Sequence, residues 1–113
     1  MDCIFCKIAK GEIPSQLLHQ DDELIAFRDI RPQAPTHVQI IPKRHIETIL
    51  DLGQMDEQLI GKMVLLANRL AKEEGLADNG YRLVFNCKSH GGQEVYHIHL
   101  HLLGGRRMAW PPG

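Results

Sequence analysis

The sequence predicts an α+β fold, in which an antiparallel sheet of about five strands carries one long helix and a short N-terminal helix. The long helix is indicated by apolar residues at three- and four-residue steps over residues 56–74. Five short apolar segments, bounded by Gly, Pro and Asp residues, are typical of strands. With 113 residues, the chain is expected to form one domain over residues 1–113.

The N-terminal segment is expected to form a short helix followed by a hairpin. Within residues 3–10, three apolar residues recur at helical spacing: Ile4, Phe5 and Ile8. Gly11 stops this helix, and Pro14 prevents it from resuming. Two strands, at residues 17–20 and 23–28, then flank an Asp-Asp turn.

The middle of the chain alternates rigid loops with regular elements. A loop at 29–36 carries two prolines and leads into a third strand at 37–42, which ends in Pro42. A short helical segment at 47–52 precedes the long helix. Asp56 suits the N-cap of that helix, and Gly75 suits its C-cap.

The C-terminal part carries a fourth strand at 81–86, a polar loop at 88–94 and a last strand at 96–103. Side chains alternate between the two faces of a strand. Three imidazoles therefore share one face of the last strand: His97, His99 and His101. Three aliphatic residues line its other face: Ile98, Leu100 and Leu102.

Composition narrows the function classes. The net charge of −1 gives no basic character that would point to nucleic acid. No apolar run approaches the roughly 20 residues that span a membrane, and the N-terminus lacks the features of a signal peptide. The cytoplasm is therefore the expected compartment. Three cysteines, an odd number, do not suggest a disulfide framework there.

The histidine row is the strongest chemical signal. Neutral imidazole is a good nucleophile towards phosphorus, provided that one ring nitrogen is free and the other is held as a donor. The central position suits this role, because a neighbouring imidazole can bind the same phosphoryl group. The preceding Gly91-Gly92 loop can offer backbone N–H groups to phosphate oxygens. A solvated histidine face on an edge strand is the alternative.

Two further patterns allow more than one interpretation. Cys3 and Cys6 have the spacing of a metal knuckle, whose other two ligands would be histidines, or they are two reduced thiols. A thioredoxin-like redox role is disfavoured, because no βαβ pattern surrounds the pair. Asp29, held in the proline-rich loop, either accepts hydrogen bonds from a ribose diol or caps a turn.

Seven segments together resemble the histidine triad (HIT) superfamily, and most of all its Hint branch of purine nucleotide-binding phosphoramidases. The resemblance covers nearly the whole chain and rests on these segments: Asp2-Cys3-Ile4-Phe5-Cys6-Lys7-Ile8, Phe27-Arg28-Asp29-Ile30, Pro32-Gln33-Ala34-Pro35-Thr36-His37, Ile41-Pro42-Lys43-Arg44-His45, Gly91-Gly92-Gln93, the run from His97 to Leu103, and Trp110-Pro111-Pro112-Gly113. It implies a homodimer whose sheet is continuous across the interface. It also implies hydrolysis of purine nucleoside 5′-phosphoramidates.

The resemblance assigns roles to individual residues. His99 matches the nucleophile that forms a nucleotidyl-histidine, His101 would bind the phosphate, and His37 would contact the same region. Asp29 would hold the ribose hydroxyls, and Trp110 would approach from the partner chain. The purine pocket would be formed by Ile4, Phe5, Ile8, Phe27 and Ile30. The phosphate would be bordered by Asn86, Gly92, Gln93 and Glu94.

The resemblance also implies a structural zinc ion bound by Cys3, Cys6, His45 and His97, and no organic cofactor. Glu94 stands where animal members of the family carry serine, so we expect it to favour cationic amine leaving groups. Two other functions are compatible with the sequence. One is a dinucleoside polyphosphate hydrolase of the same superfamily. The other is a module that senses nucleotide or binds a protein without relevant turnover.

Overall fold

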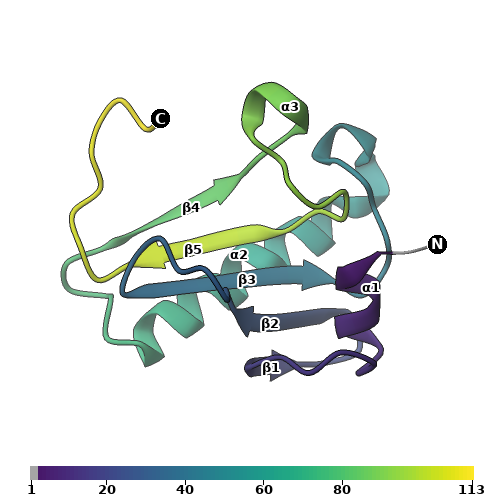
Figure 1. Cartoon of the computed structure of the whole chain (residues 1–113), viewed down its shortest axis with the longest axis horizontal. Coiled ribbons are helices and arrows are strands. Elements are labelled where there is room, and N and C mark those ends of the chain that lie inside the picture. Colours follow the sequence, from purple (N-terminus) through teal and green to yellow (C-terminus); the bar gives the residue numbers. More distant parts are fainter. Residues whose placement is uncertain (1–2) are drawn as a thin grey trace.

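The computed structural model describes residues 3–113; Met1 and Asp2, which begin the segment judged unlike a signal peptide, lie outside the described residues. Five strands form one sheet in the order β1-β2-β3-β5-β4, with every neighbouring pair antiparallel. The strands are β1 (Leu17–Gln20), β2 (Leu24–Arg28), β3 (Thr36–Pro42), β4 (Tyr81–Phe85) and β5 (Leu100–Gly104). The long helix α2 (Glu57–Glu73) lies behind this sheet, and the short helix α1 (Ile4–Ala9) lies on its front face (Figure 1). The expected α+β fold is confirmed.

A large apolar core lies between the sheet and α2. The inward face of α2 contributes Leu59, Met63, Leu66, Ala67, Leu70 and Ala71. The sheet and the segment before β5 contribute Leu24, Ala26, Val38, Ile40, Ile98, Leu100 and Leu102. The alternation predicted for the last strand is therefore confirmed, because its aliphatic residues pack against α2.

A smaller apolar cluster lies on the opposite face of the sheet, beneath α1. It joins Cys3 and Phe5 to three residues of the central strands, Ile25, Phe27 and Ile41. Because β3 is buried along its whole length, its side chains enter both clusters alternately. Val38 and Ile40 face α2, so His37 and Gln39 share the α1 face with Ile41.

The last strand begins at Leu100 rather than Tyr96, so the prediction of a strand over 96–103 was wrong in its first half. The cause lies in β3, which ends at Pro42 and cannot donate a further ladder hydrogen bond. Residues 97–99 are held instead by single bonds: Ile98 N–H donates to the Ile46 carbonyl oxygen at 2.8 Å. They lie outside the sheet, and the backbone bends at His97.

The polar loop expected at 88–94 contains one helical turn, α3 (Lys88–Gly91), which is a second correction. Gln93 holds this turn in place, because its buried Oε1 accepts from the Lys88 N–H at 2.9 Å. Its Nε2 donates to the carbonyl oxygens of Glu47 and Val95. Tertiary hydrogen bonds, not helix propensity, therefore form this turn.

The two ends of α2 differ from each other. Asp56 occupies the N-cap position but caps nothing in α2, because its carboxylate accepts from the Gly53 N–H at 2.9 Å and from Arg44. At the other end Gly75, with φ of 77°, supports a Schellman motif in which the Leu76 N–H donates to the Ala71 carbonyl oxygen at 2.8 Å. The predicted C-cap is confirmed. Two 3₁₀ turns, Ile49–Asp51 and Gln54–Asp56, precede the helix.

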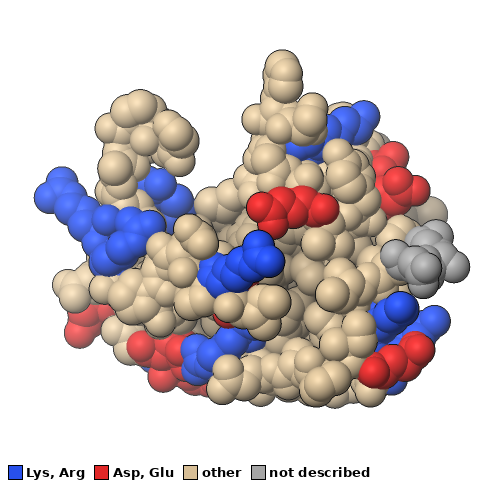
Figure 2. Space-filling view, in the orientation of Figure 1, with Lys and Arg blue, Asp and Glu red and all other residues tan. Residues whose placement is uncertain are grey.

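Within residues 3–113, no helix is long and apolar enough to cross a membrane. On the face shown in Figure 2, basic side chains gather beside the C-terminal tail, and acidic and basic side chains are mixed elsewhere.

Candidate functional site

A cavity of about 590 Å³ opens on the α1 face of the sheet, where α1, β3, β5 and the loops after β2 and α3 converge. Its apolar lining is Ile4, Phe5, Ile30 and Val95. Its polar lining is Asp29, Arg31, Gln33, His37, Gln39, Asn86, Gly92, Glu94, His99 and His101. Ile4 and Ile30 are 49% and 90% exposed, so two large apolar side chains flank the opening and are available to a flat apolar ligand group.

His99 is held with one ring nitrogen free. Its Nδ1 lies 2.8 Å from the carbonyl oxygen of His97, and a carbonyl oxygen can only accept, so Nδ1 carries the proton. Burial lowers the pKa of His99, which keeps the ring neutral near pH 7 and leaves the lone pair on Nε2. The ring of Phe5 packs edge-on against it, with centroids 5.1 Å apart.

His37 and His101 form a chain of hydrogen bonds with a fixed direction. The backbone N–H of Gln33 donates to His37 Nδ1 at 3.0 Å, so the neutral His37 carries its proton on Nε2. That Nε2 lies 2.8 Å from His101 Nδ1 and donates to it. His101 therefore carries its own proton on Nε2, and its ring lies 4.9 Å from that of His99.

Burial also controls the charge of these two rings. It lowers the pKa of His37, although the Asp29 carboxylate opposes the shift. Burial, with repulsion from His99 and His37, lowers the pKa of His101 to about 4. At neutral pH the row therefore offers one free acceptor nitrogen and one N–H donor, side by side and uncharged.

Asp29 lies beside His37 and is fixed through both carboxylate oxygens. Oδ1 accepts from the Arg31 N–H at 2.7 Å, and Oδ2 accepts from Gln39 Nε2 at 2.5 Å. Oδ2 is also 3.4 Å from His37 Nε2. Each oxygen keeps the capacity to accept a further hydrogen bond from a ligand hydroxyl.

Beside the cavity, Cys3, Cys6, His45 and His97 converge so that their ligand atoms all lie within 4.8 Å of one another. His97 Nδ1 is 3.4 Å from Cys3 Sγ and 3.3 Å from His45 Nδ1. His97 Nε2 donates to the Pro42 carbonyl oxygen at 2.7 Å, so Nδ1 presents its lone pair to the thiols. These four residues can bind a metal ion.

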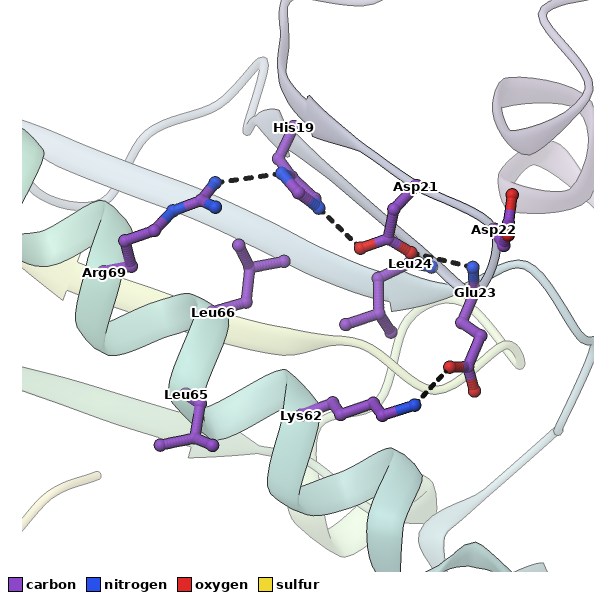
Figure 3. A pocket seen from close by; sticks show the side chains of 9 residues that line it. All are labelled: His19, Asp21, Asp22, Glu23, Leu24, Lys62, Leu65, Leu66 and Arg69. Atoms are coloured by element: carbon purple, nitrogen blue, oxygen red, sulfur yellow. Dashed lines mark hydrogen bonds and ion pairs between the residues drawn. The ribbon is translucent and has the colours of Figure 1, made fainter.

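A second hollow, of about 480 Å³, lies between β1 and α2 (Figure 3). Five of its six polar side chains, all except Asp22, pair with one another. Arg69 donates to His19 at 2.9 Å, His19 donates to Asp21 at 2.6 Å, and Lys62 donates to Glu23 at 2.5 Å. Because these groups satisfy one another, the hollow offers less for ligand recognition than the histidine-lined cavity.

Comparison with known proteins places this geometry in a family. A family model described as "Scavenger mRNA decapping enzyme C-term binding" matches residues 2–109. The chain is 55% identical, over 107 residues, to a purine nucleoside phosphoramidase of Escherichia coli K12, covering 95% of this chain and 90% of the relative. The crystal structure of a HIT family hydrolase from Legionella pneumophila Philadelphia 1 is 62% identical, with a TM-score of 0.98, covering 99% of this chain and 100% of that one.

The chain belongs to the histidine triad family. A histidine triad nucleotide-binding protein from Candida albicans is more distant, at 34% identity and a TM-score of 0.83, covering 97% of this chain and 83% of that one. The predicted family membership is confirmed.

Most residues assigned to the site of this histidine triad protein line the cavity, but four do not. Phe27 and Ile8 support Phe5 from behind, in the cluster beneath α1. Gln93 is buried, and its side chain is hydrogen-bonded to the first residue of α3 instead of facing the cavity. Trp110 is 81% exposed on the tail, so its expected approach to a partner's site stays a prediction. Glu94 is exposed at the cavity, and its effect on the leaving group likewise stays a prediction.

Four lining residues were not predicted as part of the site: Arg31, Gln33, Gln39 and Val95. Gln33 acts through its backbone N–H, which no side-chain pattern reveals. Gln39 left a signal in the sequence. It is a polar residue in an apolar strand, two positions from His37, and so shares a face with that histidine.

Lowering the pH from 7 to 5 is expected to destabilise the fold through His101. Its pKa is about 4 in the folded chain, against 6.5 ordinarily, so the unfolded chain binds more protons between these values. The free energy of unfolding therefore rises with pH across this window. Because the ring stays partly solvated, we expect a reduced contribution of roughly 1 kcal/mol.

Denaturant unfolding at the two pH values measures this contribution. His101→Asn is expected to flatten the pH dependence, while His90→Asn, on the exposed turn α3, serves as the matched control. An unaltered pH dependence in His101→Asn would contradict the assignment.

Proposed function

We propose that this histidine triad protein hydrolyses the P–N bond of purine nucleoside 5′-phosphoramidates, releasing the nucleoside monophosphate and an amine. The observation that carries the proposal is the fixed tautomer of His99, which leaves a neutral, nucleophilic Nε2 at the cavity. The 55% identity to a purine nucleoside phosphoramidase supports this substrate class.

The reaction would proceed in two displacements at phosphorus. His99 Nε2 attacks the α-phosphorus, an Nε2–P bond forms, the P–N bond of the substrate breaks, and the amine leaves after gaining a proton from solvent, which the attacking water of the second step returns. Water then attacks the same phosphorus and releases the monophosphate from His99. His101 Nε2–H, adjacent to His99, donates to a phosphoryl oxygen in both steps.

The remainder of the nucleotide would follow the polarity of the cavity. The purine lies against Ile4, Phe5 and Ile30, where the lining is apolar and partly exposed. The ribose lies near Asp29, whose carboxylate can accept from its hydroxyls. Asn86, Gly92 and Glu94 border the phosphate and the amine.

Replacement of His99 by Ala is expected to abolish turnover of adenosine 5′-monophosphoramidate, by roughly 10³-fold or more, because the nucleophile is lost. Release of AMP measures the rate, and mass spectrometry of a rapidly quenched reaction detects the nucleotidyl adduct on His99.

His90→Ala is the matched control, since His90 lies on the exposed turn α3 and outside the cavity. Equal rates for wild type and His99→Ala would refute the mechanism. A wild type that binds AMP tightly without turnover would favour the nucleotide-sensing module instead.

We further propose that the Cys3, Cys6, His45 and His97 cluster binds a structural zinc ion. A tetrahedral zinc with two sulfur and two nitrogen ligands keeps those atoms about 3.3–3.8 Å apart. The Cys6 Sγ–His45 Nδ1 and Cys6 Sγ–His97 Nδ1 distances, 3.3 and 3.6 Å, fit this geometry. Four protein ligands fill the coordination sphere, so the ion would fasten α1 to the sheet rather than activate water.

Protein purified without chelators is expected to contain about one zinc per chain by elemental analysis. The double variant Cys3→Ser, Cys6→Ser should lose the metal and unfold at a lower temperature, because α1 is no longer anchored. Cys87→Ser removes the third cysteine, which lies outside the cluster, and should keep both properties. Less than about 0.1 zinc per chain in the wild type would refute the proposal.

We also propose that two copies of the chain form a dimer through β4 and α2, with a sheet continuous across the interface. β4 is an edge strand, whose free hydrogen-bonding groups can pair with those of a second copy. Tyr81 at its start is 37% exposed. Sedimentation equilibrium should give twice the mass of the chain, and a monomer at micromolar concentration would contradict the interface.

A further inference from the structure

The carboxamide of Gln39 is a buried polar group of the cavity to which the proposed reaction assigns no role. The residue is 9% exposed, in the middle of β3. Its Nε2 donates to Asp29 Oδ2 at 2.5 Å. Its Oε1 is buried and has no hydrogen-bond partner among residues 3–113. Native proteins rarely leave a buried carbonyl oxygen unpaired, so this atom is suited to accept from a donor other than the described residues, such as a bound ligand.

The orientation of the carboxamide follows from its neighbour. If the amide were turned over, Oε1 would lie against the carboxylate oxygen of Asp29, and two acceptors would face each other. The acidic side chain therefore fixes Nε2 towards Asp29 and leaves Oε1 as the free acceptor. A ligand group that satisfies this oxygen must be a hydrogen-bond donor.

The register of the sheet places Gln39 between the two ends of the cavity. On one side it pairs with His101 of β5, which belongs to the phosphate-binding end. On the other side it pairs with Phe27 of β2. Phe27 packs against Phe5, with ring centroids 5.5 Å apart, at the apolar end. In a nucleotide, the ribose is the part that joins base and phosphate.

We propose that Gln39 is a specificity residue for ribose, and that its Oε1 accepts a hydrogen bond from a ribose hydroxyl of the bound nucleotide. Asp29 and Gln39 then act as one hydroxyl-binding pair, held together by their own hydrogen bond. This inference rests on the proposed function in one respect, that the ligand of the cavity is a ribonucleotide.

The pair has a direct consequence for selectivity. A 2′-deoxy or 3′-deoxy nucleotide lacks one donor and leaves a buried acceptor of the pair unsatisfied, which costs more than the loss of an exposed contact. The protein should therefore prefer ribonucleotides. Gln39→Leu removes one acceptor and should reduce that preference.

Calorimetric binding of AMP, 2′-deoxy-AMP and 3′-deoxy-AMP to the wild type and to Gln39→Leu tests the proposal without requiring turnover. Gln39→Leu is expected to weaken AMP binding about tenfold, the value of one buried hydrogen bond. The affinity of Gln39→Leu for one deoxynucleotide, the one that lacks the hydroxyl bound by Gln39, should stay within about twofold of the wild-type affinity for that nucleotide. Gln39→Met, which keeps the length of the side chain, should give the same pattern and guards against a packing defect in the leucine variant.

A second series separates direct contact from an effect through Asp29. The background is Asp29→Asn, which removes the carboxylate charge but keeps an amide oxygen that can accept from Gln39 Nε2. In this background, the loss of affinity caused by Gln39→Leu is still expected to be smaller for one deoxynucleotide than for AMP, because Gln39 contacts the missing hydroxyl directly. If this difference disappears, Gln39 merely positions Asp29, and the proposal is overturned. An equal loss of affinity for AMP and for both deoxynucleotides would overturn it as well.

The same measurements keep this inference distinct from the proposed function. If the wild type binds AMP but does not hydrolyse phosphoramidates, the proposed function is refuted, and the ribose selectivity can still be tested by binding. If the wild type hydrolyses phosphoramidates and Gln39→Leu keeps the same preference for ribonucleotides, only the role proposed for Gln39 is refuted.

Discussion

The hydrogen bond from His97 Nε2–H to the Pro42 carbonyl oxygen, 2.7 Å long, is the interaction on which the rest of the site depends. β3 ends at Pro42, which has no N–H to continue the ladder, so its carbonyl oxygen is available to a side chain. The bond fixes the tautomer of His97 and turns Nδ1 towards Cys3 and Cys6. Helix α1 is thereby held against the sheet, and with it Phe5 against His99.

The same residue then fixes the tautomer of His99, the proposed nucleophile. While the side chain of His97 faces the thiols, its backbone carbonyl accepts from His99 Nδ1 and so determines which nitrogen of His99 is free. On the other side of the cavity, the Gln33 N–H determines the tautomers of His37 and, through it, of His101. Backbone groups cannot change their donor or acceptor character. The protonation pattern of the row is therefore set by the fold and does not require an acidic partner for each ring.

Periodicity predicted much of this arrangement, and tertiary contacts account for the rest. The apolar spacing of α2 and the two-residue alternation of the histidines are local properties, so their faces could be read from the sequence. The start of β5 could not, because it depends on where Pro42 of another strand ends the ladder. Nor could the turn α3, which needs a side chain five residues from its first amide. For Gln39 the sequence showed only a polar side chain on the face of His37. That its Oε1 has no partner among residues 3–113, while its Nε2 donates to Asp29, depends on the packing of the loop after β2.

Under the proposed function, electrostatics explains why neutral rather than charged histidines suit the cavity. Two carboxylates, Asp29 and Glu94, border the cavity and interact with His99. Imidazolium ions beside them would bind any phosphate tightly and would also consume the nucleophilic lone pair. Neutral N–H donors instead stabilise charge where it develops on the phosphoryl oxygens, without attracting the product more strongly than the substrate. With the proposed placement of the nucleotide, the monophosphate would gain negative charge on hydrolysis beside Glu94, so repulsion would assist its release. Burial of the imidazoles, which lowers the pKa of His101 to about 4, would in this way serve the proposed reaction by keeping the rings neutral.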